Sequence, residues 1–280
     1  MKAKCWFDYK TVIITGASSG IGKGLTERLI NEHNCKVIGI ARNEQKLLDF
    51  KAELGEKGKN FTYYSLDVSV KENWEALAEG LESSGIAPDI LINNAGILPR
   101  FDNFMNYSEK DISSAMSINF YSCVYAMRAM LPLLLKSESA AIINIASSAA
   151  LCALAGTSLY SASKAALKSF TDAAREEYRG RCYMGLVCPG FTKTDIFRNQ
   201  SQSSEKAQKA MDFISTDCDR MVDLIIRGIW KKKPEMVFGA DAHLMEKGRK
   251  LFGAGFSYLS SQVMRISGLS IFKDIFEFEI

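Results

Sequence analysis

Near the start of the chain, a short strand, a glycine-rich turn and an amphipathic helix are predicted to follow one another directly. Residues 10–15 are rich in β-branched side chains, and residues 23–32 carry apolar side chains at helical spacing. The turn between them, Gly16–Gly22, has glycine at positions 16, 20 and 22. Glycines let a backbone approach a ligand closely, and a helix N-terminus attracts negative charge. This segment therefore predicts a phosphate site inside an α/β fold.

The alternation of strands and helices continues along most of the chain. The further expected strands are residues 36–40, 61–66, 89–93, 141–146, 182–188 and 236–238, and the further expected helices are residues 44–55, 71–83, 109–136, 160–179 and 217–231. Short apolar strands separated by such helices form a parallel sheet with helices on both faces. Right-handed crossovers then predict a doubly wound, seven-stranded Rossmann-type fold. The helix at 109–136 is expected to bend or break at Pro132, because proline lacks the N–H that helix bonding needs.

Length and charge limit the classes of protein that the chain can belong to. Its 280 residues, 47% of them hydrophobic, fit one domain over residues 1–240 and a helical C-terminal extension over residues 241–280. The net charge of +3 is spread along the chain and argues against nucleic-acid binding. The seven cysteines and two histidines show no metal-type spacing, so no metal is expected. With neither a secretory segment nor a transmembrane stretch expected, the prediction is a cytoplasmic protein.

Tyr160, Lys164 and Ser147 form the group with the clearest chemical meaning. Tyr160 and Lys164 are one helical turn apart, so both side chains can point into one cleft. A nearby ammonium favours the phenolate and is expected to lower the pKa of Tyr160 from about 10 toward neutrality. Ser147 follows the expected strand at 141–146, where its hydroxyl can bind a substrate oxygen beside the phenol.

Seven ordered motifs between about residues 8 and 240 resemble the classical short-chain dehydrogenase/reductase family. They are Thr15-Gly16-x-x-x-Gly20-x-Gly22, Asp67-Val68, Asn93-Asn94-Ala95-Gly96, Asn119, Ser147, Tyr160-x-x-x-Lys164 and Pro189-Gly190. The resemblance implies an NAD(P)-dependent oxidoreductase that transfers hydride between nicotinamide and a secondary alcohol or ketone. Tyr160 would be the general acid or base, and Asn119, Ser147 and Lys164 would complete the catalytic set. Asn119 would bend the long helix and hold a water that links Lys164 to solvent.

The same resemblance implies a set of cofactor-binding residues. They are Gly16, Ser18, Ser19, Gly20, Ile21, Gly22, Arg42, Asp67, Val68, Asn93, Ala95, Gly96, Tyr160, Lys164, Pro189, Gly190, Thr192 and Thr194. Asp67 would contact the adenine, although it could instead cap the helix at residue 71. Asn93 is expected to tie neighbouring strands together rather than take part in the chemistry. Pro189–Thr194 would hold the nicotinamide carboxamide.

NADP is expected in preference to NAD. NAD-preferring relatives place a carboxylate at the end of the second strand, where this chain has Ala41 followed by Arg42. A guanidinium can grip the 2′-phosphate of NADP through two hydrogen bonds. Ser19 departs from this pattern, because many NADP-preferring relatives carry a basic residue there.

The expected substrate pocket is mostly apolar. Its proposed lining is Leu98, Pro99, Arg100, Phe101, Ala149, Leu151, Leu154, Leu159, Phe191 and Ile196, of which Leu98, Leu154, Phe191 and Ser147 are the expected substrate contacts. This composition favours a steroid, bile acid, long-chain or aromatic carbonyl compound. The polar segment at residues 200–205 would be either a substrate lid or a surface loop without function.

Residues 241–280 carry an apolar stripe at helical spacing. The extension is expected to pack on its own domain or on a partner subunit, with contact to a lipid surface as the less favoured alternative. The resemblance implies a homodimer or homotetramer assembled through the helices at 109–136 and 160–179.

Two other functions compete with the oxidoreductase. Gly16-Ala17-Ser18-Ser19-Gly20 also matches the nucleophile elbow of serine hydrolases, with Asp195 or Asp217 and His243 as partners of Ser18. That interpretation places the elbow on the first strand and leaves Tyr160 and Lys164 unexplained. A non-catalytic NADP-binding regulator is the other alternative, and the complete catalytic set argues against it.

Overall fold

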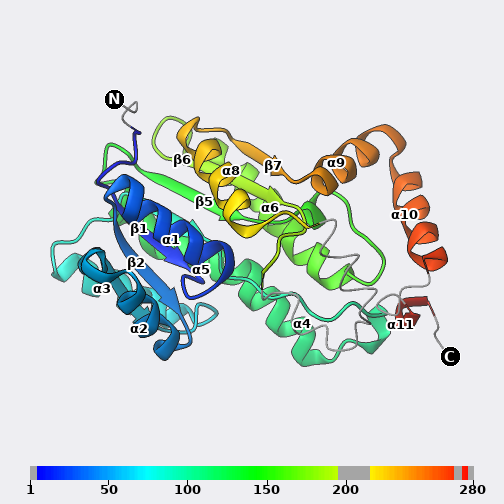
Figure 1. Ribbon diagram of the computed structural model, residues 1–280, viewed down its shortest axis with the longest axis horizontal. Helices are drawn as coiled ribbons and strands as arrows, with labels where there is room; N and C mark the ends of the chain where they lie inside the picture. The colour runs from blue at the N-terminus through cyan, green and yellow to red at the C-terminus, as the bar shows by residue number, and fades with distance from the viewer. Residues whose placement is uncertain (1–4, 195–214, 268–272, 277–280) are drawn as a thin grey trace.

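Seven strands form one parallel sheet in the computed structural model, which describes residues 5–194, 215–267 and 273–276 (Figure 1). The strands are β1 (Thr11–Thr15), β2 (Lys36–Ala41), β3 (Phe61–Ser65), β4 (Ile90–Asn93), β5 (Ala141–Ile145), β6 (Tyr183–Pro189) and β7 (Glu235–Phe238). Their order across the sheet is β3-β2-β1-β4-β5-β6-β7, and every neighbouring pair is parallel. The predicted doubly wound fold is therefore confirmed.

Helices cover both faces of this sheet. They are α1 (Gly20–His33), α2 (Glu44–Glu53), α3 (Lys71–Ser83), α4 (Glu109–Met116), α5 (Ser122–Leu134), α6 (Ser158–Glu177), α8 (Cys218–Trp230), α9 (Ala240–Phe252), α10 (Ala254–Ile266) and α11 (Lys273–Phe276). The apolar residues of α1, α2 and α8 pack on one face, and those of α3, α5 and α6 pack on the other. Successive residues of β1 alternate between these two cores, with Val12 and Ile14 in the first and Ile13 in the second. This two-sided burial explains why the strands are continuous apolar runs.

The order of the strands reverses between β1 and β4. From β1 the chain moves outward through β2 and β3, and then returns to β4 on the other side of β1. The loops that leave the carboxyl ends of β1 and β4 consequently run in opposite directions. Such a switch point opens a crevice where ligands bind in doubly wound folds.

The long helix expected at 109–136 is interrupted at Asn119, as the family resemblance implied, and not at Pro132, where the missing N–H had placed a bend. A π-helical turn at Ser117–Tyr121 separates α4 from α5, and α5 continues past Pro132 to Leu134. The cause is Asn119, whose side chain bonds to the backbone of Ile97 and holds the helix at that point. Single π turns of this kind are frequent at functional sites.

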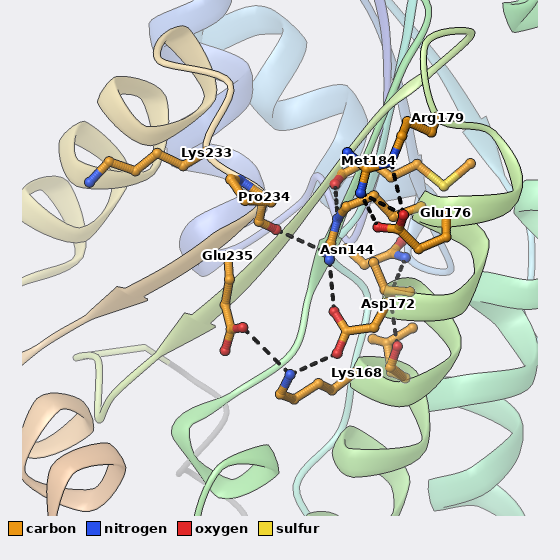
Figure 2. A network of polar contacts seen from close by, with 12 residues as sticks. Asn144, Lys168, Asp172, Glu176, Arg179, Met184, Lys233, Pro234 and Glu235 are labelled. Carbon is orange, nitrogen blue, oxygen red and sulfur yellow. Dashed lines mark hydrogen bonds and ion pairs between the residues drawn. The ribbon is translucent and has the colours of Figure 1, made fainter. Parts of the chain in front are cut away.

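Helix α6 is held to the sheet by polar contacts along its length. Asn144 of β5 donates to Thr171 Oγ1 over 2.8 Å and accepts from Asn93 of β4 over 2.8 Å. Near the end of the helix, Arg175 donates to the carbonyl oxygens of Met184 and Pro234. Figure 2 shows the adjoining ion pairs, in which Lys168 lies between Asp172 of the same helix and Glu235 of β7. These contacts hold α6 against β5, β6 and the start of β7.

The chain continues after β7 into α9, α10 and α11, and α9 and α10 lie at one end of the molecule, opposite α2 and α3 (Figure 1). In the part of the chain that the structure describes, no helix has both the length and the apolar character needed to span a bilayer.

We predict that Gly22→Ala destabilises the protein by about 1–3 kcal/mol, because the added methyl group would overlap the Gly16 carbonyl and the Asn94 side chain. The matched control is Gly80→Ala in α3, where an added methyl group meets no atom within 4 Å. That change should raise stability by roughly 0.5–1 kcal/mol, since alanine is the better helix former. Urea unfolding measures both variants, and equal effects would contradict the close approach at Gly22.

Candidate active site

Two adjoining clefts follow the carboxyl edge of the sheet. The first has a volume of about 310 Å³ and contains Ser147, Tyr160 and Lys164. The second has a volume of about 560 Å³ and contains Arg42 and Asp67. The turn after β1 and the segment after β4 line both clefts through Gly16, Ser19, Ala95, Gly96 and Ile97. Together they form one elongated crevice at the switch point.

The glycine turn brings backbone close to backbone at the start of α1. Gly16 and Gly20 have φ values of 68° and 51°, which side chains with a Cβ rarely adopt. Gly22 lies so close to Gly16 that no side chain fits between them. Ser19, the N-cap residue of α1, makes no capping bond with its side chain, and the first turn of the helix carries no acidic residue. The N–H groups and dipole of this helix end are therefore available to an anion.

Thr15 and Asn94 fasten the two sides of the crevice to each other. The backbone N–H groups of Asn94 and Ala95 both donate to Thr15 Oγ1 over 2.9 Å, and Asn94 Nδ2 donates to the Thr15 carbonyl oxygen. Both residues belong to motifs quoted from the sequence, but neither was proposed as a site residue. Only pairing across the sheet shows that they hold the glycine turn against β4.

The second cleft has a positive end and a polar wall. Arg42 and Lys46 both line it, and the sequence had indicated only the first of them. The carboxylate of Asp67 accepts from the N–H and the hydroxyl of Ser69, whereas the N-cap of α3 is Val70. Asp67 therefore closes a turn ahead of α3 rather than capping the helix. Burial alone would raise the pKa of Asp67, but the bonds from Ser69 and the charge of Arg42 outweigh it and lower that pKa.

Val68 and Asn93, two of the expected cofactor residues, have structural partners. The carbonyl oxygen of Val68 accepts from the Trp74 indole over 2.9 Å, and the Val68 side chain lines the second cleft. Asn93 is buried and bonded to Asn144, so it ties β4 to β5 as the sequence predicted.

Tyr160, Lys164 and Ser147 meet in the first cleft. Tyr160 and Lys164 lie on consecutive turns of α6, and the Lys164 ammonium is 6.0 Å from the centre of the Tyr160 ring. The buried Lys164 Nζ donates to the carbonyl oxygen of Ile145 over 2.9 Å. Gly96 makes room for it, since an added Cβ there would come within 3.2 Å of Lys164 Nζ.

Burial dominates the ionisation of this group. It raises the pKa of Tyr160, and a hydrogen bond with Ser147 offsets only part of that effect. Burial also lowers the pKa of Lys164. The sequence had led us to expect a lowered tyrosine pKa, and the net direction in this structure is the opposite. The cause is that removing a phenolate from water costs more than its neighbours return here.

Asn119 is buried and is not the solvent-facing helical asparagine that its sequence position alone would also allow. Its Oδ1 accepts from the Ile97 N–H over 2.8 Å, and its Nδ2 donates to the Ile97 carbonyl and to Ser163 Oγ over 3.0 Å each. Ser163 in turn donates to the Tyr160 carbonyl oxygen. Asn119 thus links the segment after β4 to the turn of α6 that carries Tyr160.

The loop after β6 rests on a carboxylate that the sequence did not reveal. Asp241 of α9 accepts from the Phe191 N–H over 2.7 Å, and an added Cβ at Gly190 would overlap the Asp241 carboxylate. Pro189, Gly190, Thr192 and Thr194 all line the first cleft. Because Asp241 is about fifty residues from this loop in the chain, no local motif could have indicated it.

Apolar residues close the outer end of the first cleft. Leu98, Leu154 and Phe191 line it as predicted, together with Met245 of α9, which the sequence did not indicate. Leu98 and Phe101 also pack against Met264 of α10 and Ile275 of α11. Ile196 and the polar segment at 200–205 lie outside the described residues.

The alternative hydrolase triad is not assembled by the residues that the structure describes. His243 lies beside Glu246 at 3.8 Å, and the Asp217 carboxylate caps α8 by accepting from the Asp219 N–H. Asp195 lies outside the described residues.

Cys5, Asp8 and His33 come within 4.8 Å of one another, although their spacing in sequence is not typical of a metal site. Two hydrogen-bonding contacts account for this cluster without an ion. His33 Nδ1 lies 2.7 Å from Asp8 Oδ1, and the N–H of Cys5 donates to Asp8 Oδ2.

Comparison with known proteins gives a consistent result. Residues 10–205 match the model of the family described as short chain dehydrogenase. The chain is 33% identical to a 3beta-hydroxysteroid dehydrogenase 2 of Eggerthella lenta, over 70% of this chain and 76% of that protein. It is also 33% identical to a 3-oxoacyl-(acyl-carrier-protein) reductase of Vibrio cholerae, over 72% of this chain and 81% of that protein. The crystal structure of a short chain dehydrogenase from Burkholderia cenocepacia in complex with NADP is similar, with a TM-score of 0.75, 25% identity, and coverage of 91% and 98% of the two chains.

We predict that Asn119→Ala lowers the free energy of unfolding by about 2–4 kcal/mol, because it removes a fully buried side chain and leaves the N–H and carbonyl of half-buried Ile97 without their partner. Asn31→Ala on the exposed face of α1 is the matched control and should change stability by no more than about 0.5 kcal/mol. Thermal or urea unfolding measures both variants. A near-neutral Asn119→Ala would contradict the bridging role of this side chain.

Proposed function

Because this chain belongs to the short-chain dehydrogenase family, whose members act on CH–OH or C=O groups with a nicotinamide cofactor, we propose that it interconverts an apolar ketone and its secondary alcohol. The observation that carries the proposal is the meeting of Ser147, Tyr160 and Lys164 in a cleft continuous with the glycine turn. The hydrolase and the non-catalytic regulator leave this meeting unexplained.

The crevice fits a dinucleotide in both chemistry and shape. The pyrophosphate would lie against the glycine turn, at Gly16, Gly20 and Gly22, and against the open N-terminus of α1. Gly96 and Lys164 would lie beside the nicotinamide ribose, and the loop around Thr192 would hold the carboxamide. When bound, the cofactor supplies or accepts the hydride at its nicotinamide ring.

Tyr160 is the proposed proton donor for ketone reduction. A phenol is protonated at neutral pH and the raised pKa of Tyr160 does not change that, so Tyr160 is in the state that can give a proton to a developing alkoxide. Ser147 would donate a second hydrogen bond to the same oxygen and stabilise its charge. Lys164 would orient the cofactor ribose through its ammonium group, which its hydrogen bond to the Ile145 carbonyl already holds in place. Asn119 would act through the α6 backbone as a positioning residue and, as the family resemblance implied, could hold a water beside Lys164.

NADP is the proposed cofactor. Arg42 and Lys46 supply two cations at the end of the second cleft, and Ala41 places no carboxylate there. This arrangement suits a 2′-phosphate, whereas a carboxylate at the same position would repel it.

An apolar substrate suits the outer end of the first cleft. Leu98, Phe101, Leu154 and Phe191 surround this region, and Met245 adds a further apolar wall from α9. A hydroxysteroid, for which the Eggerthella lenta relative is named, is an apolar secondary alcohol of this kind.

We also propose that residues 1–240 are a single Rossmann domain, that residues 241–280 are an extension of it, and that the chain assembles as a homodimer or homotetramer.

Replacing Tyr160 by Phe should reduce turnover of apolar ketones by about 10²–10⁴-fold, because the proton donor is removed. NADPH binding, followed by its fluorescence, should change little. Tyr9→Phe is the control, since Tyr9 is exposed and lies just before the N-terminal end of β1, at the edge of the sheet opposite the crevice. Turnover near the wild-type rate in a folded Tyr160→Phe variant would remove this phenol from the mechanism.

Replacing Arg42 by Ala should raise the dissociation constant of NADPH by about 10–100-fold and that of NADH by less than about threefold. The difference arises because only NADPH carries the 2′-phosphate. Lys36→Ala, which removes an exposed cation at the other end of β2, is the control and should affect neither cofactor. Equal losses for both cofactors in Arg42→Ala would show that Arg42 does not contact this phosphate.

A further inference from the structure

Helices α9 and α10 expose large apolar side chains that the fold does not cover. Leu244, Leu251 and Phe252 are exposed on α9, and Tyr258, Leu259, Val263 and Ile266 are exposed on α10. Leu251 is 77% exposed and Ile266 is 81% exposed. Leu259, Val263 and Ile266 follow one another at helical spacing, so they form one stripe along α10. We call these seven residues the C-terminal apolar surface. Seven exposed large apolar side chains on two adjoining helices are more than the scattered apolar residues of an ordinary surface, and they indicate an interaction site.

The same helices are bound to the rest of the molecule by their other sides. Met245 of α9 faces the first cleft, and Met264 of α10 packs with Leu98 and Phe101. The Phe256 ring occupies the space that a side chain at Gly248 would need, which joins α10 to α9. The C-terminal apolar surface is therefore not the face that docks the extension onto its own domain.

Charges near the C-terminal apolar surface are mainly positive. Helix α10 contains no acidic residue, and its one charged residue, Arg265, lies over the Phe276 ring, 4.9 Å from the ring centre. On α9 the two carboxylates are already engaged, Asp241 with the Phe191 N–H and Glu246 with Lys250. Lys247 and Arg249 are exposed and form no ion pair within the described part of the chain. Apolar side chains accompanied by exposed cations such as these two are complementary to a layer of anionic headgroups over acyl chains.

A second copy of the chain fits this surface less well. A two-fold interface places the same patch against itself, so the cations of one copy would face those of the other. The unengaged carboxylates needed to pair with them are lacking among the described residues of α9 and α10. Helix α10 is also too short to cross a bilayer, so it would lie in the plane of the interface.

We propose that α9 and α10 bind the surface of an anionic lipid bilayer through the C-terminal apolar surface and the cations Lys247 and Arg249. Binding of this kind does not depend on catalysis. It would place the membrane about one helix diameter, roughly 10 Å, from the apolar end of the first cleft. An apolar ketone dissolved in the membrane would then be close to the site, a consequence that rests on the proposed function.

Flotation of the full-length chain with vesicles tests the proposal. One set of vesicles contains only phosphatidylcholine, and the other also contains phosphatidylglycerol. We expect the chain to float with the anionic vesicles and at least about tenfold less with the neutral ones, since headgroup charge adds to apolar burial. If the full-length chain stays at the bottom of both gradients and does not float with either set of vesicles, the proposal is overturned.

Two variants separate the apolar and ionic contributions. The triple variant Leu259→Ser, Val263→Ser, Ile266→Ser should reduce vesicle binding by about tenfold or more. Its matched control is Leu48→Ser, Ile86→Ser, Ile112→Ser, which changes exposed apolar residues elsewhere and should float like the wild type. The double variant Lys247→Gln, Arg249→Gln should bind anionic vesicles more weakly, while its binding to neutral vesicles stays unchanged. The binding that remains should depend less on salt concentration than that of the wild type.

The oligomeric state distinguishes a lipid surface from a second copy. Light scattering after size-exclusion chromatography should give the same mass for the wild type and the folded α10 triple variant, while NADPH binding stays intact in both. A mass that falls in the triple variant, together with no vesicle binding by the wild type, would assign this surface to subunit contact and refute the lipid proposal. Loss of NADPH binding by the wild-type chain would contradict only the proposed function.

Discussion

The buried side chain of Asn144 joins the three elements on which the candidate site depends. It accepts from Asn93 on β4 and donates to Thr171 on α6, while it sits itself on β5. Each of these polar groups would be costly to leave unpaired in the core, so together they specify one register between helix and sheet. That register carries Tyr160 and Lys164 to the carboxyl ends of the strands, where the glycine turn also ends.

The Lys164 side chain is anchored to the sheet as well as lying beside Tyr160. Its ammonium is buried, donates to the Ile145 carbonyl and passes close to Gly96. The Tyr160 phenol is itself removed from water, and this desolvation outweighs the bond from Ser147. The Tyr160 phenol is therefore protonated at neutral pH in this structure.

The C-terminal helices connect the site to the outer surface of the molecule. Asp241 supports the loop at Gly190 and Phe191. Met245 lines the apolar end of the first cleft, and Met264 packs in one cluster with Leu98 and Phe101, which also line it. The opposite sides of the same helices expose Leu251, Val263 and Ile266. A surface bound there would lie close to the apolar end of the cleft, because α10 is one helix thick.

Local patterns were sufficient to predict the strands, most helices, the glycine turn and the Tyr160–Lys164 pair, since these depend on residues that are close in the chain. They did not reveal the bonds from Asn119 to Ile97, the Thr15–Asn94 bonds or the Asp241 support, because each of these joins segments that are distant in the chain. The pKa of Tyr160 also required the fold, since the net shift depends on how far protein replaces water around the phenol. The same holds for the C-terminal apolar surface: periodicity showed an apolar stripe, and only packing determined which of its residues stay exposed.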